Sequence, residues 1–93
     1  MERKKLTPDE ITDRLSALTG WKAEDDKLKK GFKFENFAES LEFVNKAGAI
    51  AERHDHHPDI TFGWGYADFV ITTHSEGGIT AKDFALAEEI DAI

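Results

Sequence analysis

Apolar residues recur at three- and four-residue steps in three stretches of the chain, a spacing typical of amphipathic helices. The first stretch begins at Thr7, which we expect to cap a helix, with Pro8 at the first helical position and Glu10 completing a capping box. The apolar face of this helix consists of Ile11, Leu15 and Leu18. Gly20 is expected to end the helix, because glycine commonly follows a helix C-terminus.

A second and longer helix is predicted from about Phe37 to Asp55, with Asn36 as its N-cap. Its main apolar stripe consists of Phe37, Leu41, Val44, Ala47 and Ala51. Phe43 and Ile50 widen this stripe. A helix of this kind either has a broad core face or also packs against a partner subunit, and the sequence leaves both interpretations open.

A third helix is predicted to begin after Thr80, which we expect to be its N-cap, with Asp83 at the third helical position. The spacing of apolar residues in this helix is compatible with either of two buried faces. The residues concerned are Phe84, Ala87 and Ile90, or Leu86 and Ile93.

Residues 21–34 are predicted to form a β-hairpin whose turn is the polar run 24–27. In the second arm of this hairpin, one face carries Leu28, Phe32 and Phe34. Lys30 interrupts that apolar face. Either its ammonium group snorkels from an edge strand, which charged residues often protect, or it points into a site; we favour the edge interpretation.

Two further strands are predicted over residues 60–65 and 66–74. Phe62 and Trp64 share one face of the first strand. In the second strand, the residues expected to face the helices are Phe69, Ile71 and Thr73. His74 should therefore project from the opposite face.

The predicted order is helix, two strands, helix, two strands, helix, within a single domain of residues 1–93. Strands that follow one another through short turns pair in the antiparallel sense. We therefore expect an α+β fold with a four-stranded antiparallel sheet and three helices on one face.

The composition removes several classes of function. A net charge of −7 argues against a nucleic-acid-binding surface, because phosphate contacts need clustered Lys and Arg. The absence of cysteine excludes a disulfide framework and a thiolate metal site. The chain has no apolar run of about 18 residues and a charged start, so we expect no membrane segment and a cytoplasmic location.

Three of the four histidines cluster at the predicted end of the second helix. Pro58 should push His57 into an extended conformation, whereas His56 is expected to remain in the last helical turn. Glu52 stands four residues before His56, so we expect these two side chains to share one helical face. His54 is expected to be a solvated surface residue.

Histidine clusters are compatible with three kinds of chemistry. A metal site is possible because imidazole is a common ligand, but no His-Glu-x-x-His signature is present. Metal-free proton transfer is the second interpretation, because imidazoles act as general acids and bases near neutral pH. A binding or dimerisation module with incidental histidines is the third.

Several short motifs occur together in this chain. They are His56-His57-Pro58, Thr73-His74 and Gly78-Ile79-Thr80-Ala81-Lys82-Asp83, with Leu6-Thr7, Gly20-Trp21, Phe32-Lys33-Phe34-Glu35-Asn36-Phe37 and Ala51-Glu52. In this combination and order, the chain resembles the pterin-4a-carbinolamine dehydratases over nearly its whole length. It differs at Ile60, where members of that family commonly carry an aromatic residue.

The resemblance implies an enzyme that converts 4a-hydroxytetrahydrobiopterin to quinonoid dihydropterin and water during tetrahydrobiopterin recycling. The implied catalytic residues are His56, His57 and His74. The implied substrate-binding residues are Glu52, Pro58, Thr73, Asp83 and Trp64. The resemblance also implies no metal, no cofactor and a homodimer or homotetramer, with a non-catalytic module resembling a transcription cofactor as the alternative.

Overall fold

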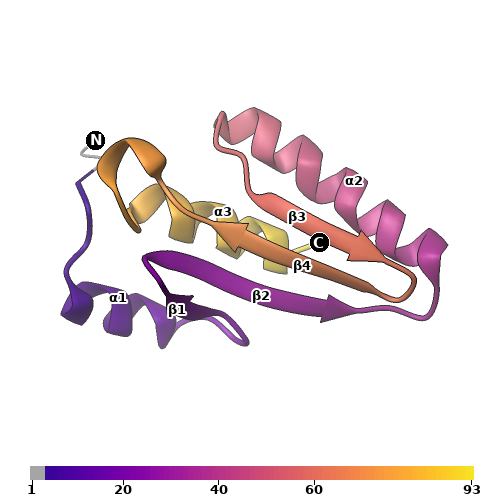
Figure 1. Ribbon diagram of the computed structural model, residues 1–93, viewed down its shortest axis with the longest axis horizontal. Helices are drawn as coiled ribbons and strands as arrows, with labels where there is room; N and C mark the ends of the chain where they lie inside the picture. The colour runs from indigo at the N-terminus through magenta and orange to yellow at the C-terminus, as the bar shows by residue number, and fades with distance from the viewer. Residues whose placement is uncertain (1–3) are drawn as a thin grey trace.

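A computed structural model describes residues 4–93, so residues 1–3 of the predicted domain lie outside the described part (Figure 1). The helices and strands follow the predicted order, and a short 3-10 helix precedes the last α-helix. The helical elements are α1 (Pro8–Leu15), α2 (Phe37–His54), η1 (His74–Glu76) and α3 (Ala81–Asp91). The strands are β1 (Lys22–Glu24), β2 (Lys27–Lys33), β3 (Asp59–Gly63) and β4 (Tyr66–Ile71).

The four strands form one antiparallel sheet in the order β1-β2-β4-β3. Strand β4 lies inside the sheet, where Phe69 is opposite Lys30 of β2 and Ile60 of β3. In Figure 1 the last helix α3 lies behind the sheet, and the long helix α2 runs alongside β3 and contacts both α3 and the sheet. The predicted α+β fold, with a four-stranded antiparallel sheet and three helices on one face, is confirmed.

The core fills the space between the sheet and the helices. Alternate residues of β4 face this core, and Ala67, Phe69 and Ile71 are almost completely buried, as the predicted alternation requires. Helix α3 contributes Phe84, Leu86, Ala87 and Ile90. Burial of each large apolar side chain contributes about 2 kcal/mol, so this layer holds the strands and helices that carry the site.

Side-chain caps define the helix starts as predicted. Thr7 and Glu10 form a reciprocal capping box at α1, and Thr80 and Asp83 form another at α3. At α2, the side chain of Asn36 accepts a hydrogen bond of 2.9 Å from the backbone N–H of Glu39. Each cap satisfies backbone donors that the first helical turn leaves unpaired.

Three predicted boundaries are wrong because turns begin earlier than the apolar pattern indicates. Helix α1 ends at Leu15, and short-range backbone hydrogen bonds form a turn before Gly20, which has a φ of 83°. Strand β3 ends at Gly63, so Trp64 lies in the hairpin turn and is 72% exposed. Strand β4 ends at Ile71. Thr73 then makes an isolated antiparallel bridge to Gly78, and residues 74–76 between them form η1.

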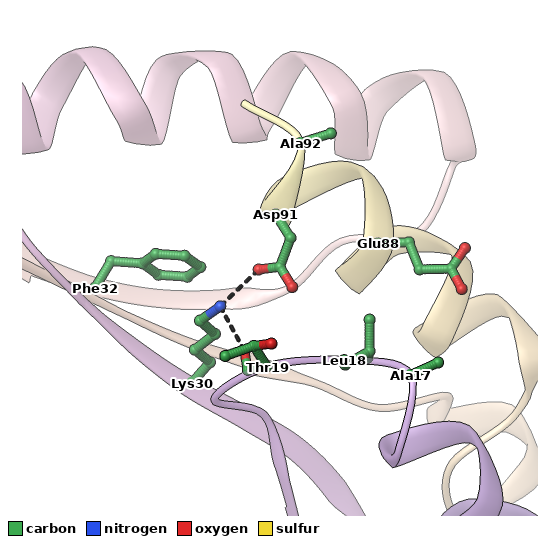
Figure 2. A pocket seen from close by; sticks show the side chains of 8 residues that line it. All are labelled: Ala17, Leu18, Thr19, Lys30, Phe32, Glu88, Asp91 and Ala92. Atoms are coloured by element: carbon green, nitrogen blue, oxygen red, sulfur yellow. Dashed lines mark hydrogen bonds and ion pairs between the residues drawn. The ribbon is translucent and has the colours of Figure 1, made fainter.

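Lys30 faces the helices from the part of β2 that β1 does not pair, but its side chain is only 17% exposed and lines a hollow, so its ammonium group does not snorkel into solvent (Figure 2). Its Nζ donates hydrogen bonds to the Thr19 carbonyl oxygen at 2.7 Å and to Asp91 Oδ1 at 2.8 Å. The ammonium group also lies 4.7 Å from the centre of the Phe32 ring. The Nε1–H of Trp21 donates to the same Asp91 carboxylate, so this cluster ties the end of α3 to the sheet.

Candidate active site

The antiparallel pairing of β3 and β4 brings the histidine motifs together. The segment before β3 carries His56 and His57, and the segment after β4 carries His74. Because Asp59 at the start of β3 lies opposite Val70 near the end of β4, these segments meet at one end of the sheet, where α2 also ends in Figure 1. A hollow of about 350 Å³ lies there, and its lining is Asp55, His56, His57, Thr72, Thr73, His74, Ser75 and Lys82.

Helix α2 ends two residues before His56, which was predicted to lie in its last turn. The last helical residue is His54, and Asp55 follows in a left-handed conformation with φ 50° and ψ 43°. The backbone N–H of His56 bonds to the Ala51 carbonyl at 3.2 Å and that of Asp55 to the Glu52 carbonyl, also at 3.2 Å. This is a Schellman ending, with aspartate in the place that glycine usually takes.

The reversal at Asp55 changes which histidine Glu52 contacts. We expected Glu52 to share a helical face with His56, but its Oε2 lies 2.5 Å from Nε2 of His57. The expectation is wrong because His56 and His57 both lie beyond the helix, where helical spacing no longer applies. His57 and Glu52 are both more than half exposed, so this pair is open to solvent and to a ligand.

His56 contacts a buried carboxylate instead. Its Nε2 lies 2.5 Å from Oδ1 of Asp83, and the His56 side chain is 11% exposed while that of Asp83 is fully buried. The second oxygen of Asp83 accepts hydrogen bonds from the Thr80 backbone N–H at 2.8 Å and from the Thr73 hydroxyl at 2.9 Å. Asp83 is therefore both the first-turn carboxylate of α3 and the partner of a histidine in the hollow.

Three of the residues implied as substrate-binding, Thr73, Pro58 and Trp64, lie at different distances from the histidines. Thr73 is 4% exposed, and its hydroxyl already has two protein partners, Asp83 and Thr80. Pro58 separates His57 from the first residue of β3 and is half-buried. Trp64 lies at the other end of the β3–β4 hairpin, so the structure does not bring it to the histidines of its own chain.

His74 lies exposed at the start of η1, on the rim of the hollow, and its ring makes no hydrogen bond within residues 4–93. Sequence reasoning did not assign four of the lining residues to the site: Asp55, Thr72, Ser75 and Lys82. A clue to Lys82 was available, because the capping box at Thr80 and Asp83 fixes it in the first turn of α3. Its side chain adds a positive charge to the hollow.

His54 does not belong to the hollow and is not the solvated residue that we expected. Its side chain is 21% exposed, and its Nε2 contacts Oε2 of Glu89 on α3. Arg53 also reaches Glu89, with Nη2 at 3.2 Å from Oε1. The hydrogen bond from His54, helped by the charges of His54 and Arg53, holds the pKa of Glu89 below its ordinary value of 4.5.

A larger hollow, of about 580 Å³, lies beside the Lys30 and Asp91 ion pair, between the end of α3 and the segment that follows α1 (Figure 2). Lys30 and Asp91 bond to each other in this hollow, and Lys30 also bonds to the Thr19 carbonyl. It contains no histidine. We therefore place the candidate acid–base site in the smaller hollow, where the titratable rings gather.

Two further observations concern residues 4–93 as a whole. No group of three or more His, Cys, Asp or Glu side chains in this part of the chain is arranged to hold a metal ion. No helix in the same part is long and apolar enough to cross a membrane.

The fold and the site together define a small α+β protein of the pterin dehydratase class, with histidines around a hollow at one end of the sheet. The chain belongs to the pterin 4 alpha carbinolamine dehydratase family, whose sequence model matches residues 4–93.

Relatives of known sequence and structure agree with this assignment. A Sulfolobus acidocaldarius protein named "Putative pterin-4-alpha-carbinolamine dehydratase" is 51% identical over 96% of this chain and 98% of its own length. A Mycobacteroides abscessus protein of the same name is 48% identical over 92% of each chain. The crystal structure of a transcriptional coactivator/pterin dehydratase from Brucella melitensis superposes with a TM-score of 0.92 at 34% identity, over 96% of this chain and 97% of that one.

A second solved structure has a different described role. It is a pterin dehydratase-like protein identified as a RuBisCO assembly factor in the alpha-carboxysome. It superposes with a TM-score of 0.64 at 25% identity, over 77% of this chain and 83% of that one. The fold is therefore shared by proteins with more than one described role.

Proposed function

We propose that this protein dehydrates 4a-hydroxytetrahydrobiopterin, or a closely related 4a-hydroxytetrahydropterin, during tetrahydrobiopterin recycling. The observation that carries the proposal is the meeting of His56, His57 and His74 around one hollow, with a carboxylate on each of the first two rings. The hollow's volume of about 350 Å³ falls in the range of small-molecule sites, roughly 300–1,000 Å³.

The reaction needs one acid and one base. The bond between C4a and the hydroxyl oxygen breaks, the oxygen takes a proton and leaves as water, and N5 loses its proton as the N5–C4a double bond forms. We assign the base to His57, because Glu52 accepts its Nε2–H and so leaves the lone pair on Nδ1. We assign the acid to His74, which has no carboxylate partner within residues 4–93.

His56 has a different part in this proposal. Its ring is mostly buried and tied to Asp83, so it is better suited to hold the substrate than to move toward a proton. We expect the loss of its ring to raise KM more than it lowers kcat.

The test is an assay of 4a-hydroxytetrahydropterin dehydration with purified protein and its His57→Ala variant. The proposal expects activity in the parent and a kcat at least about 100-fold lower in the variant, the low end for losing a positioned acid or base. A matched control is Lys33→Ala, an exposed residue of β2 away from the hollow, which should keep the parent rate. Equal rates in the parent and His57→Ala would refute the proposal.

The proposal includes catalysis without a metal ion or cofactor. Elemental analysis of active protein should find less than stoichiometric zinc or iron, and a chelator should leave the rate unchanged. Stoichiometric metal whose removal abolishes activity would contradict this part of the proposal.

A binding or dimerisation module is the second candidate function. It is favoured by the exposed apolar side chains of Phe37 and Leu41 on α2, which are 45% and 39% accessible. The Brucella melitensis relative is described as a transcriptional coactivator as well as a pterin dehydratase. A protein that binds a partner through α2 but has no dehydratase activity would favour this candidate.

A further inference from the structure

A buried row of hydrogen bonds leads from the first turn of α3 to the histidine hollow. The backbone N–H of Lys82 donates to Oγ1 of Thr80 at 3.2 Å, and this oxygen lies 2.8 Å from Oγ1 of Thr73. The Thr73 hydroxyl is 2.9 Å from Oδ2 of Asp83, and Oδ1 of Asp83 is 2.5 Å from Nε2 of His56. Thr80 and Asp83 are fully buried and Thr73 is 4% exposed, so water does not compete for these contacts.

The direction of this row follows from its buried donors. The Thr80 hydroxyl accepts from a backbone N–H, and the Thr73 hydroxyl is its one other hydrogen-bond partner within residues 4–93. Thr80 must therefore donate to Thr73, because otherwise its O–H would be buried without an acceptor. Thr73 has one hydroxyl proton, which it then donates to Asp83.

All donors in this row point toward the Asp83 carboxylate. Its Oδ2 accepts hydrogen bonds from the Thr73 hydroxyl and from the Thr80 backbone N–H. Both lone pairs of this oxygen are then used, so it does not carry a proton as well. When the carboxylate is ionised, its remaining oxygen, Oδ1, can only accept, so it accepts from His56. The Nε2 atom of His56 carries the hydrogen, and in the neutral ring Nδ1 carries the lone pair.

We propose that Thr73 and Thr80 are positioning residues that fix His56 in its Nε2–H tautomer through Asp83. His56 thereby presents Nδ1 as a hydrogen-bond acceptor for an N–H group of the ligand, such as a ring N–H or an amino group. In its kinetic part this inference rests on the proposed function, whereas the tautomer itself is a property of the protein without substrate.

The tautomer is measured by ¹⁵N chemical shifts of the His56 ring in the full chain, at a pH where the ring is neutral. The parent should show a protonated Nε2 and an unprotonated Nδ1. Thr73→Val, which keeps the shape and loses the hydroxyl, should shift the ring toward a mixture of tautomers. Thr73→Ser restores the hydroxyl and should restore the parent spectrum.

If Thr73→Val does not fold by circular dichroism, Thr73→Ala tests the same hydroxyl with a smaller side chain. An unchanged Nε2–H tautomer in the folded variant would overturn the inference. So would a Thr73→Ser spectrum that matches Thr73→Val, because the effect would then come from packing.

In the dehydration assay, Thr73→Val should raise KM about 10-fold and change kcat less than about 3-fold. A 10-fold effect is about the low end for losing a group that orients an imidazole through its hydrogen-bond partner. Thr73→Ser should return KM to within about 2-fold of the parent. A parent without activity would refute the proposed function, while the ¹⁵N spectra would still decide the positioning role. A tautomer shift with unchanged KM would overturn the role of His56 Nδ1 in ligand binding.

Discussion

At the scale of single residues, backbone conformation decides which carboxylate each histidine contacts. Asp55 adopts a left-handed conformation, so His57 returns toward Glu52 and His56 meets Asp83 from another helix. Helical spacing alone paired Glu52 with His56. The sequence identified the three histidines of the hollow and both carboxylates, but not which carboxylate contacts which ring, because the helix ending depends on an aspartate in a conformation more typical of glycine.

Asp83 should be important for stability as well as for the site. Replacing it with alanine leaves the Thr80 N–H and the Thr73 hydroxyl without their buried acceptor. We expect Asp83→Ala to lower the free energy of unfolding by about 3 kcal/mol, as measured by urea denaturation at a fixed protein concentration.

The control for Asp83→Ala is Glu88→Ala, an exposed residue of the same helix, which should change stability by less than about 0.5 kcal/mol. If Asp83→Ala lowers the free energy of unfolding by less than about 1 kcal/mol, the hydrogen bonds of Asp83 do not stabilise the fold as its contacts indicate.

At the scale of secondary-structure elements, the starts of helices were predictable and several ends were not. Caps at Thr7, Asn36 and Thr80 depend on residues within the same turn, so the sequence displays them directly. The end of α1 depends on turn hydrogen bonds, and the end of β4 depends on the bridge between Thr73 and Gly78. Those contacts involve conformations that an apolar pattern does not encode.

The contact between α2 and α3 at Glu89 should make stability depend on pH. The hydrogen bond from His54 lowers the pKa of Glu89 below 4.5, so the folded state favours the ionised carboxylate. This stabilisation is present above the unfolded pKa and is lost as the pH falls through the lower folded pKa. The parent should therefore have a higher Tm than Glu89→Gln at about pH 5.5, and the difference should become smaller when the pH is lowered to about 3.

Thermal melts of both proteins at the two pH values test this expectation. Glu88→Gln, one position earlier and exposed, is the matched control and should follow the parent at both values. A Tm difference between parent and Glu89→Gln that is equal at both pH values would contradict the assigned role of the Glu89 charge.

At the scale of the whole molecule, antiparallel pairing explains both the fold and the location of the site. Short turns between strands predicted the pairing of β3 with β4, and this pairing brings His57 and His74 to one end of the sheet. The contact of Lys30 and Trp21 with Asp91 was not predictable in the same way. This contact depends on where the C-terminal end of α3, which carries Asp91, packs against the sheet, and no local sequence pattern specifies that position.

The exposed apolar residues of α2 favour self-association of the protein. Phe37 and Leu41 belong to the predicted apolar stripe, yet they remain accessible while Ala47 and Ala51 are buried. We expect the protein to form at least a dimer, because a small core gains from further apolar burial. Sedimentation at micromolar concentration should give at least twice the chain mass of 10.5 kDa.

Leu41→Glu should shift this equilibrium toward the monomer by placing a charge in the proposed interface. Lys46→Glu introduces the same side chain on another side of α2 and serves as the control. A parent that sediments as a monomer would refute self-association. An assembly that tolerates Leu41→Glu as well as Lys46→Glu would show that this part of α2 is not the interface.

The most direct test of the central claim compares alanine variants of three histidines in the dehydration assay. His57→Ala and His74→Ala remove rings that line the hollow, whereas His54→Ala removes a ring of the same cluster that contacts Glu89 instead. With folding verified by circular dichroism, the first two should each lower kcat by about 100-fold or more, and His54→Ala should keep the parent rate to within about 3-fold. A His54→Ala variant as inactive as His57→Ala would contradict the placement of the active site in this hollow.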